Sequence, residues 1–129
     1  MKLWIDDLRP APEGYIWLKS VNEAKEWIEW IEEILNELQS NLSFRHSYHE
    51  ERQKMFIENI QEQIVFFKIT IIDIDHDAGD YADDGGDYIR LLDWMEETGR
   101  NYPVKLHTMN PVGFEKMKMI IEKNGWDKI

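Results

Sequence analysis

The sequence predicts an α/β fold with a short, mostly parallel sheet of about four strands. Two observations carry this prediction. Short apolar segments typical of buried strands alternate with longer segments whose apolar residues repeat at helical spacing. Three of the apolar segments also end in polar, titratable side chains. Ligands bind at the carboxyl ends of parallel strands in open α/β sheets, so this second pattern predicts one site at that edge.

The predicted strands are short. The first covers residues 2–5 and the second covers residues 15–18, with a turn-rich segment (PAPEG) before the second. The nine-residue link between them is too short for a helical crossover, so their relative direction stays open. A continuous apolar run beginning at Val65 predicts the third strand, and residues 104–107 predict the fourth.

Between the second and third strands, residues 20–63 predict a helical hairpin. Ser20 or Asn22 caps a long amphipathic helix that runs to about Gln39, and a second helical pattern follows a polar break. We expect His46 and His49 in this hairpin to be solvated surface residues. A self-association face of the chain is also expected on the hairpin.

Two further helices are expected around the fourth strand. One follows Gly85 and Gly86 and ends near Gly99. The other begins at Pro111, a favoured first helical residue, with Asn110 as its cap.

The composition of the chain limits the classes of protein and of binding partner that fit it. The 129 residues predict one domain, and 43% apolar content with 12% aromatic residues predicts a globular fold. Without cysteine there is neither a disulfide nor a thiolate metal site. The absence of a long apolar run or signal-peptide pattern predicts a cytoplasmic chain with no membrane partner. A net charge of −11 argues against extended nucleic-acid binding, but a bound divalent cation would still allow a small phosphorylated ligand.

Acidic residues close the first and third strands. Asp6 and Asp7 follow the first strand, and Asp75, His76 and Asp77 follow the third. Adjacent carboxylates repel, and a cation such as Mg²⁺ or Mn²⁺ relieves that repulsion. We therefore predict a metal site made by Asp6, Asp7 and Asp75, with Asp77 as a further ligand or an orienting residue. The alternative is a solvated turn in which Asp7 caps the local backbone.

The spacing of acids from Asp73 onward is also similar to the start of a calcium loop. Ala78 occupies the position that needs a sharp-turn glycine, Asp84 replaces the closing glutamate, and a strand leads into the segment. These departures argue against an EF-hand.

The same edge is expected to hold phosphate. His107 ends the fourth strand, and Thr108 and Asn110 add a hydroxyl and an amide before a helix N-terminus, which favours anions. Gly85 and Gly86, which precede the next predicted helix, offer a second place where phosphate oxygens could come close to the backbone. The planar guanidinium of Arg9 either binds the phosphate through two hydrogen bonds or neutralises the charge of Asp6 or Asp7.

These residues resemble those of a response-regulator receiver domain. The resemblance implies metal binding by Asp6 and Asp7, a phosphoacceptor at Asp75 and a hydroxyl position at Thr108. The sequence departs from the receiver pattern because the residues after Thr108 are mostly one helix, with no fifth strand ending in lysine, and Lys105 lies inside the fourth strand. His76 and His107 have no counterpart in that pattern.

A divergent branch of that fold, the receiver-like domains that process cyclic phosphates, is more similar. Its signatures resemble residues 6–12 (DDLRPAP), 75–79 (DHDAG), 86–88 (GDY) and 107–113 (HTMNPVG). The resemblance implies a truncated receiver-like (flavodoxin-like) sheet of about four mostly parallel strands, in a single domain over residues 1–129. The helical hairpin then is an insertion at about residues 36–66.

Together these features predict a metal-dependent phosphoesterase for a small cyclic or terminal phosphate, such as a cyclic nucleotide or an RNA end. Asp75 would work with the metal, and His76 or His107 would be the general acid or base. The alternative is a non-catalytic receiver-like signalling module, or a module that binds a nucleotide or phosphate.

Overall fold

The computed structural model of the chain describes residues 1–43 and 50–129. It divides into two compact units, which are described separately. Unit 1 contains residues 1–26 and 69–129, and unit 2 contains residues 27–68. His46 and His49, predicted above to be surface residues, lie outside the described residues.

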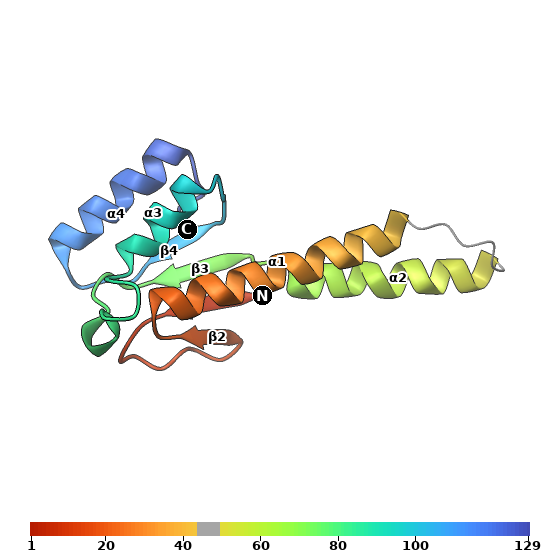
Figure 1. Ribbon diagram of the computed structural model, residues 1–129, viewed down its shortest axis with the longest axis horizontal. Helices are drawn as coiled ribbons and strands as arrows, with labels where there is room; N and C mark the ends of the chain where they lie inside the picture. The colour runs from red at the N-terminus through yellow and green to blue at the C-terminus, as the bar shows by residue number, and fades with distance from the viewer. Residues whose placement is uncertain (44–49) are drawn as a thin grey trace. The chain divides into compact units, whose positions relative to one another are not determined.

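Unit 1 is built on a four-stranded sheet (Figure 1). The strands are β1 (Lys2–Ile5), β2 (Tyr15–Leu18), β3 (Ile71–Ile74) and β4 (Val104–Leu106), in the order β2-β1-β3-β4. All neighbouring pairs are parallel, which confirms the predicted α/β fold. The direction that the sequence left open is therefore settled: β2 runs parallel to β1, although the loop between them contains no helix.

Two of the helices that begin in unit 1 have a side-chain cap at their first turn. α1 (Val21–Ser43) begins in unit 1, where the hydroxyl of Ser20 accepts a hydrogen bond from Glu23 N at 3.0 Å. A short 3₁₀ helix, η1 (Gly79–Tyr81), precedes α3 (Ile89–Glu97). α4 (Pro111–Asn124) begins as predicted, with the Asn110 side chain accepting from Gly113 N at 3.0 Å.

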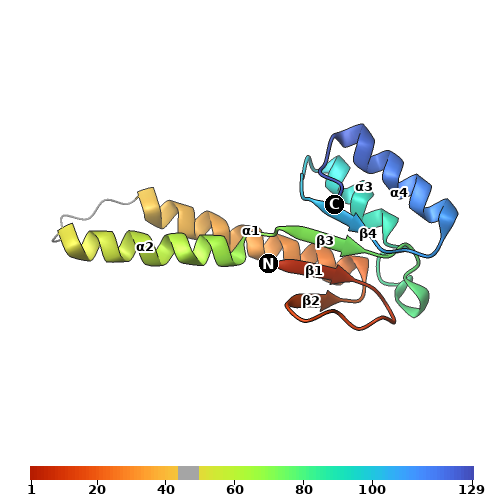
Figure 2. The ribbon, with the colours of Figure 1, turned by 180° about the vertical axis from the view of Figure 1, so that it is seen from behind.

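Strand alternation gives the sheet two different faces. Leu3 and Ile5 share a face with Ile72 and Ile74. In Figure 2 the sheet is seen in front of α3. Trp4 and Asp73 are register partners on the opposite face. The covered face carries the core of unit 1, which includes the fully buried residues Leu3, Ile5, Ile72, Ile74, Leu91, Leu92, Met95, Val104, Met117 and Ile121. The opposite face brings Trp4 and Asp73 next to the end of β4.

Unit 2 contains the rest of α1 and all of α2 (Glu50–Phe67). The prediction that the third strand begins at Val65 is wrong, because Val65–Phe67 are the last residues of α2 and β3 begins at Ile71. An apolar run does not by itself distinguish a strand from a helix end. Val65 is 72% exposed, so this part of the run is not core.

Exposed large apolar side chains on unit 2 are Trp30, Met55, Phe56, Ile57, Val65 and Phe66. Self-association through this surface stays a prediction, as do the predicted domain and insertion boundaries. In the part of the chain that the structure describes, none of the helices has the length and apolarity that crossing a bilayer requires.

Candidate functional site

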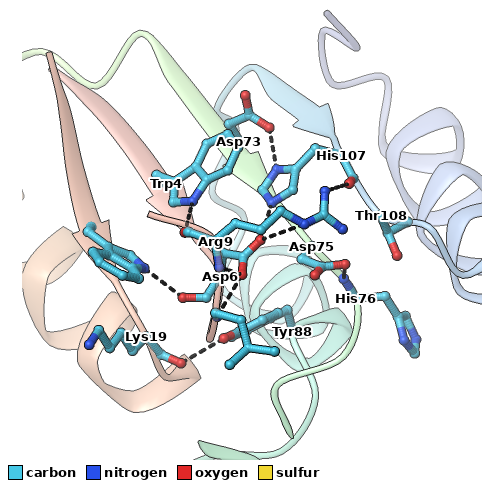
Figure 3. Close-up of polar contacts among 12 residues, drawn as sticks. Trp4, Asp6, Arg9, Lys19, Asp73, Asp75, His76, Tyr88, His107 and Thr108 are labelled. Atoms are coloured by element: carbon cyan, nitrogen blue, oxygen red, sulfur yellow. Dashed lines mark hydrogen bonds and ion pairs between the residues drawn. The ribbon is translucent and has the colours of Figure 1, made fainter. Parts of the chain in front are cut away.

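Three strand ends meet at the carboxyl edge of the sheet. Asp6 follows β1, Asp75 follows β3 and His107 follows β4. One ligand atom from each of these side chains lies within 4.8 Å of the other two, and Asp6 and Asp75 are 1% and 9% exposed. Figure 3 shows the Asp6 carboxylate at the centre of this group. The parallel topology thus assembles residues that are up to 101 positions apart in the chain.

Asp6 is held by the turn that follows it. Its Oδ1 accepts hydrogen bonds from Leu8 N at 2.9 Å and Arg9 N at 2.8 Å, and its Oδ2 lies 2.8 Å from His107 Nε2. Burial by itself would raise the pKa of this carboxyl. The hydrogen bonds from Arg9, Leu8 and His107 outweigh burial, so the pKa of Asp6 is lowered and the residue is a carboxylate at neutral pH.

His107 lies between two buried acids. Its Nδ1 is 2.6 Å from Asp73 Oδ1, and its Nε2 is 2.8 Å from Asp6 Oδ2. Its ring stacks on Trp4 with 3.9 Å between ring centroids and 3° between ring planes. Burial would lower the pKa of His107, but the two acids raise it above its ordinary value. Each ring nitrogen has a carboxylate oxygen within hydrogen-bond distance, an arrangement that favours the protonated ring.

Asp7 lies beside the group of three rather than within it. Its carboxylate packs against Gly79, where a side chain would collide with Asp7 Oδ2. Gly79 has φ of +53°, so glycine suits both the space and the backbone there. Burial raises the pKa of Asp7, and the negative charges of Asp6, Asp75 and Asp80 raise it further. This carboxyl would gain from a nearby cation.

A second polar group surrounds His76 at the start of α4. His76 Nδ1 lies 2.8 Å from Asp77 Oδ1 and 3.4 Å from Asn110 Nδ2. The ring packs on Gly113, where an added Cβ would lie 2.9 Å from Nδ1 and closer still to the ring carbons. The side chain of His76 is 14% exposed. Asp77, predicted as a metal ligand or an orienting residue, here contacts His76 and Asn110.

The predicted phosphate-binding residues fall into two sets. Arg9 lies at the site, where its Nη1 donates to His107 O at 3.1 Å and its Nε is 3.9 Å from Asp6 Oδ2. Thr108 Oγ1 accepts from Asn110 N at 3.1 Å. Arg9 thus contacts His107 and Asp6, and Thr108 contacts the backbone of Asn110. Contact of either residue with phosphate stays a prediction.

Gly85 and Gly86 form the other set. A Cβ on Gly85 would lie 2.8 Å from Val21 Cβ and Asn22 Oδ1, and one on Gly86 would lie 2.9 Å from Arg90 Cγ. The preceding residue, Asp84, accepts a hydrogen bond from Ser20 Oγ at 2.6 Å. These glycines allow the loop to pack closely on the first turn of α1. Their assignment to phosphate is untested.

A model of the cyclic-phosphate processing receiver domain matches residues 1–49 and 46–123. The chain belongs to this family. No curated protein and no solved structure matches it. The family confirms the resemblance drawn from the motifs, and it associates the chain with cyclic-phosphate processing at the level of the family.

The donor set of this receiver-like site fits a divalent cation. Asp6 and Asp75 offer carboxylate oxygens, and His107 offers an imidazole nitrogen, all within 4.8 Å of one another. Receiver domains bind divalent metal through acidic residues. Burial and then the charges of Asp6, Asp75 and Asp80 raise the pKa of Asp7, so a cation at this edge would favour its ionised form.

Sequence reasoning missed two residues of the site, Asp73 and Trp4. Asp73 is 3% exposed, and its carboxylate holds His107. One signal was present: Asp73 is an acid inside an apolar strand, two residues before Asp75 and so on the same face of β3. Trp4 gave no signal, because an aromatic residue in a strand is ordinarily core.

Proposed function

We propose that this family member is a metal-dependent phosphoesterase that hydrolyses a small cyclic or terminal phosphate, such as a cyclic nucleotide or an RNA end. The observation that carries the proposal is the contrast between the two histidines beside the acids. Both nitrogens of His107 contact buried carboxylates, whereas only Nδ1 of His76 has a partner within the described residues. Nε2 of His76 is therefore available for proton transfer.

The acids would hold a divalent ion, Mg²⁺ or Mn²⁺ on the sequence prediction, through Asp6 and Asp75, with Asp7 nearby. Such an ion would withdraw negative charge from a phosphoryl oxygen. Arg9 and the N-terminus of α4 add positive potential at the same edge. These groups would position the phosphate beside Asp75 and His76, which are consecutive in the chain.

His76 would handle the proton of the reaction. The oxygen of a water molecule forms the new bond to phosphorus, and the ester P–O bond breaks on the opposite side. A proton lost by the water passes through His76 Nε2 to the departing oxygen, so no further reactant is needed. Asp77 would keep the ring oriented through Nδ1, from which it lies 2.8 Å.

The test is a metal-supplemented turnover screen against 2′,3′-cyclic nucleotides, cyclic dinucleotides and phosphomonoesters. His76→Gln is expected to lower turnover of the active substrate by about 100-fold or more. Metal affinity, measured by calorimetry, should remain close to that of the wild type. Asp83→Asn, at an exposed acid outside the site, is the control for Asp75→Asn, which should lose both metal and activity. Metal binding without hydrolysis of any phosphate in the screen would contradict the proposal.

The alternative function, a phosphoacceptor module, is favoured by the position of Asp75. This residue follows β3, is 9% exposed and lies within ligand distance of Asp6. Acetyl phosphate would then add a stable phosphoryl group to the Asp75 carboxylate, with release of acetate. Mass spectrometry showing stoichiometric phosphorylation at Asp75, together with a negative turnover screen, would establish this function instead of hydrolysis.

A further inference from the structure

Asp73 is an unusual residue for the middle of a short buried strand. It is the register partner of Trp4 on one side and of Lys105 on the other, and it is 3% exposed. A buried carboxylate is strongly unfavourable unless it is paired and hydrogen-bonded. The partner that the structure provides is Nδ1 of His107, at 2.6 Å.

His107 is consequently fixed in orientation. Asp73 holds Nδ1, the indole of Trp4 covers one ring face, and the backbone N–H of His107 donates to Ile74 O at 3.1 Å. Figure 3 shows the remaining nitrogen, Nε2, directed at the Asp6 carboxylate. The contact between Nε2 and Asp6 Oδ2 is 2.8 Å. The ring thus presents one nitrogen to the two acids of the cation site.

This arrangement is the one in which proteins present histidine to a metal. A metal-binding histidine donates its other N–H to a carboxylate, which fixes the tautomer and makes the ligating nitrogen more basic. In His107 the carboxylate of Asp73 takes that second position.

We infer that His107 Nε2, positioned by Asp73 and Trp4, is a ligand of the divalent ion together with Asp6 and Asp75. This nitrogen gives the site a preference for an imidazole-binding transition metal, Zn²⁺ or Co²⁺, over Mg²⁺. Oxygen-only sites suit Mg²⁺, whereas imidazole nitrogen suits Zn²⁺ and related ions. Three protein ligands with an open position are also the usual set of a catalytic zinc site.

The inference rests on the proposed function only in placing a divalent ion at this edge, and it names the kind of ion. It also assigns the two histidines different tasks. His107 binds the ion, and Asp73 is a positioning residue that acts through His107. His76, whose Nε2 is not directed by a buried acid, is left for proton transfer.

The experiment is calorimetric titration of the full chain with Zn²⁺, Co²⁺ and Mg²⁺ separately. The variants are His107→Gln, Asp73→Asn and, as the matched histidine control, His76→Gln. We expect Zn²⁺ and Co²⁺ to bind with one ion per chain and more tightly than Mg²⁺. His107→Gln and Asp73→Asn should each weaken Zn²⁺ binding by about 10- to 100-fold, and His76→Gln should not. Mg²⁺ affinity should change little in His107→Gln.

A spectroscopic readout separates ligation from folding. The visible absorption of Co²⁺ bound to the wild-type chain should shift in His107→Gln and stay unchanged in His76→Gln. Circular dichroism identifies a variant that does not fold, and Asp73→Asn, which keeps the side-chain shape, then carries the test. Equal affinities for Mg²⁺ and Zn²⁺, or equal losses in His107→Gln and His76→Gln, would overturn the inference. Nitrogen ligation without phosphate hydrolysis would support it and contradict the proposed function alone.

Discussion

His107 and His76 lie at the same edge of one sheet, yet their surroundings differ. His107 is stacked on Trp4 and lies between the carboxylates of Asp73 and Asp6. His76 contacts Asp77, an exposed acid, at the N-terminus of α4. Buried acids on both nitrogens fix the charge and the orientation of His107. One exposed acid on a single nitrogen orients His76 but leaves its other nitrogen for reaction.

The comparison shows that residue type and position in a motif do not assign a catalytic role by themselves. Both histidines lie in segments that carried the resemblance to the family, at residues 75–79 and 107–113, and both segments fall within the residues that its model matches. The two rings differ at Nε2: in His107 this nitrogen contacts the buried carboxylate of Asp6, and in His76 it has no partner within the described residues. A nitrogen between two buried carboxylates is suited to holding a cation, and an unpaired nitrogen at a helix N-terminus is suited to moving a proton.

The largest effect that would test this comparison comes from filling the space beside His76. Gly113→Ala places a methyl group against the His76 ring, which must move. We expect turnover to fall by about 10- to 100-fold, because small misplacements of a catalytic group are costly. The free energy of unfolding should fall by about 1 kcal/mol, since the collision with the His76 ring costs more than the helix preference of alanine returns. Turnover assays and chemical denaturation measure both.

Val112→Ala is the control for Gly113→Ala. It changes an exposed neighbour in the same helical turn and leaves the space beside His76 unaltered. Its turnover should match the wild type. An equal loss of turnover in both variants would show that the effect comes from α4 and not from His76.

The second test concerns the charge on His107. Its pKa is raised in the folded chain, so its protonated form stabilises the fold. This contribution is complete below the ordinary histidine pKa of 6.5 and is lost as the pH rises through the higher folded value. In a buffer containing a chelator, we expect the free energy of unfolding to fall as the pH rises from below 6.5 into the alkaline range.

His107→Gln should flatten that pH dependence, while His76→Gln should keep it. Asp6 affects the free energy of unfolding with the opposite pH dependence. Its pKa is lowered, so its contribution is present above the ordinary value of 3.8 and is lost as the pH falls through the folded value. A wild-type profile that is flat between neutral and alkaline pH would show that His107 is not held as a cation.

The strands and their polar ends could be predicted because their signals are local. Four-residue apolar segments and the pair Asn110 and Pro111 are read within a few positions, and β2 and α4 begin where predicted. The end of α2 could not be placed, because the run from Val65 contains apolar residues that suit either a helix or a strand.

The convergence of the strand ends followed from parallel topology, but the pairing of side chains did not. Asp73 and His107 are 34 positions apart, and their contact depends on the β3–β4 register and the rotation of one ring. Trp4 stacks on that ring across another strand pair. Such contacts are set by packing in three dimensions, so sequence patterns identify the residues near a site more readily than the task of each one.

The smallest expected effect comes from Asp7. It tests whether the carboxylates beside His107 repel one another in the absence of a cation. Its pKa is raised, first by burial and then by the charges of Asp6, Asp75 and Asp80. An acid with a raised pKa weakens the fold once the pH exceeds its ordinary value of 3.8, and the full penalty applies once the pH also exceeds the folded value. In a chelator, Asp7→Asn should therefore stabilise the chain by about 0.5 kcal/mol. Adding Zn²⁺ or Mg²⁺ should stabilise the wild type more than the variant, because the cation relieves the repulsion only where it exists.

Thermal melts with and without metal measure both differences, with Asp83→Asn as the control for removal of one exposed charge. If Asp7→Asn lowers the melting temperature in chelator and gains as much from metal as the wild type, Asp7 is a structural turn residue, and the cation at His107 is held without it.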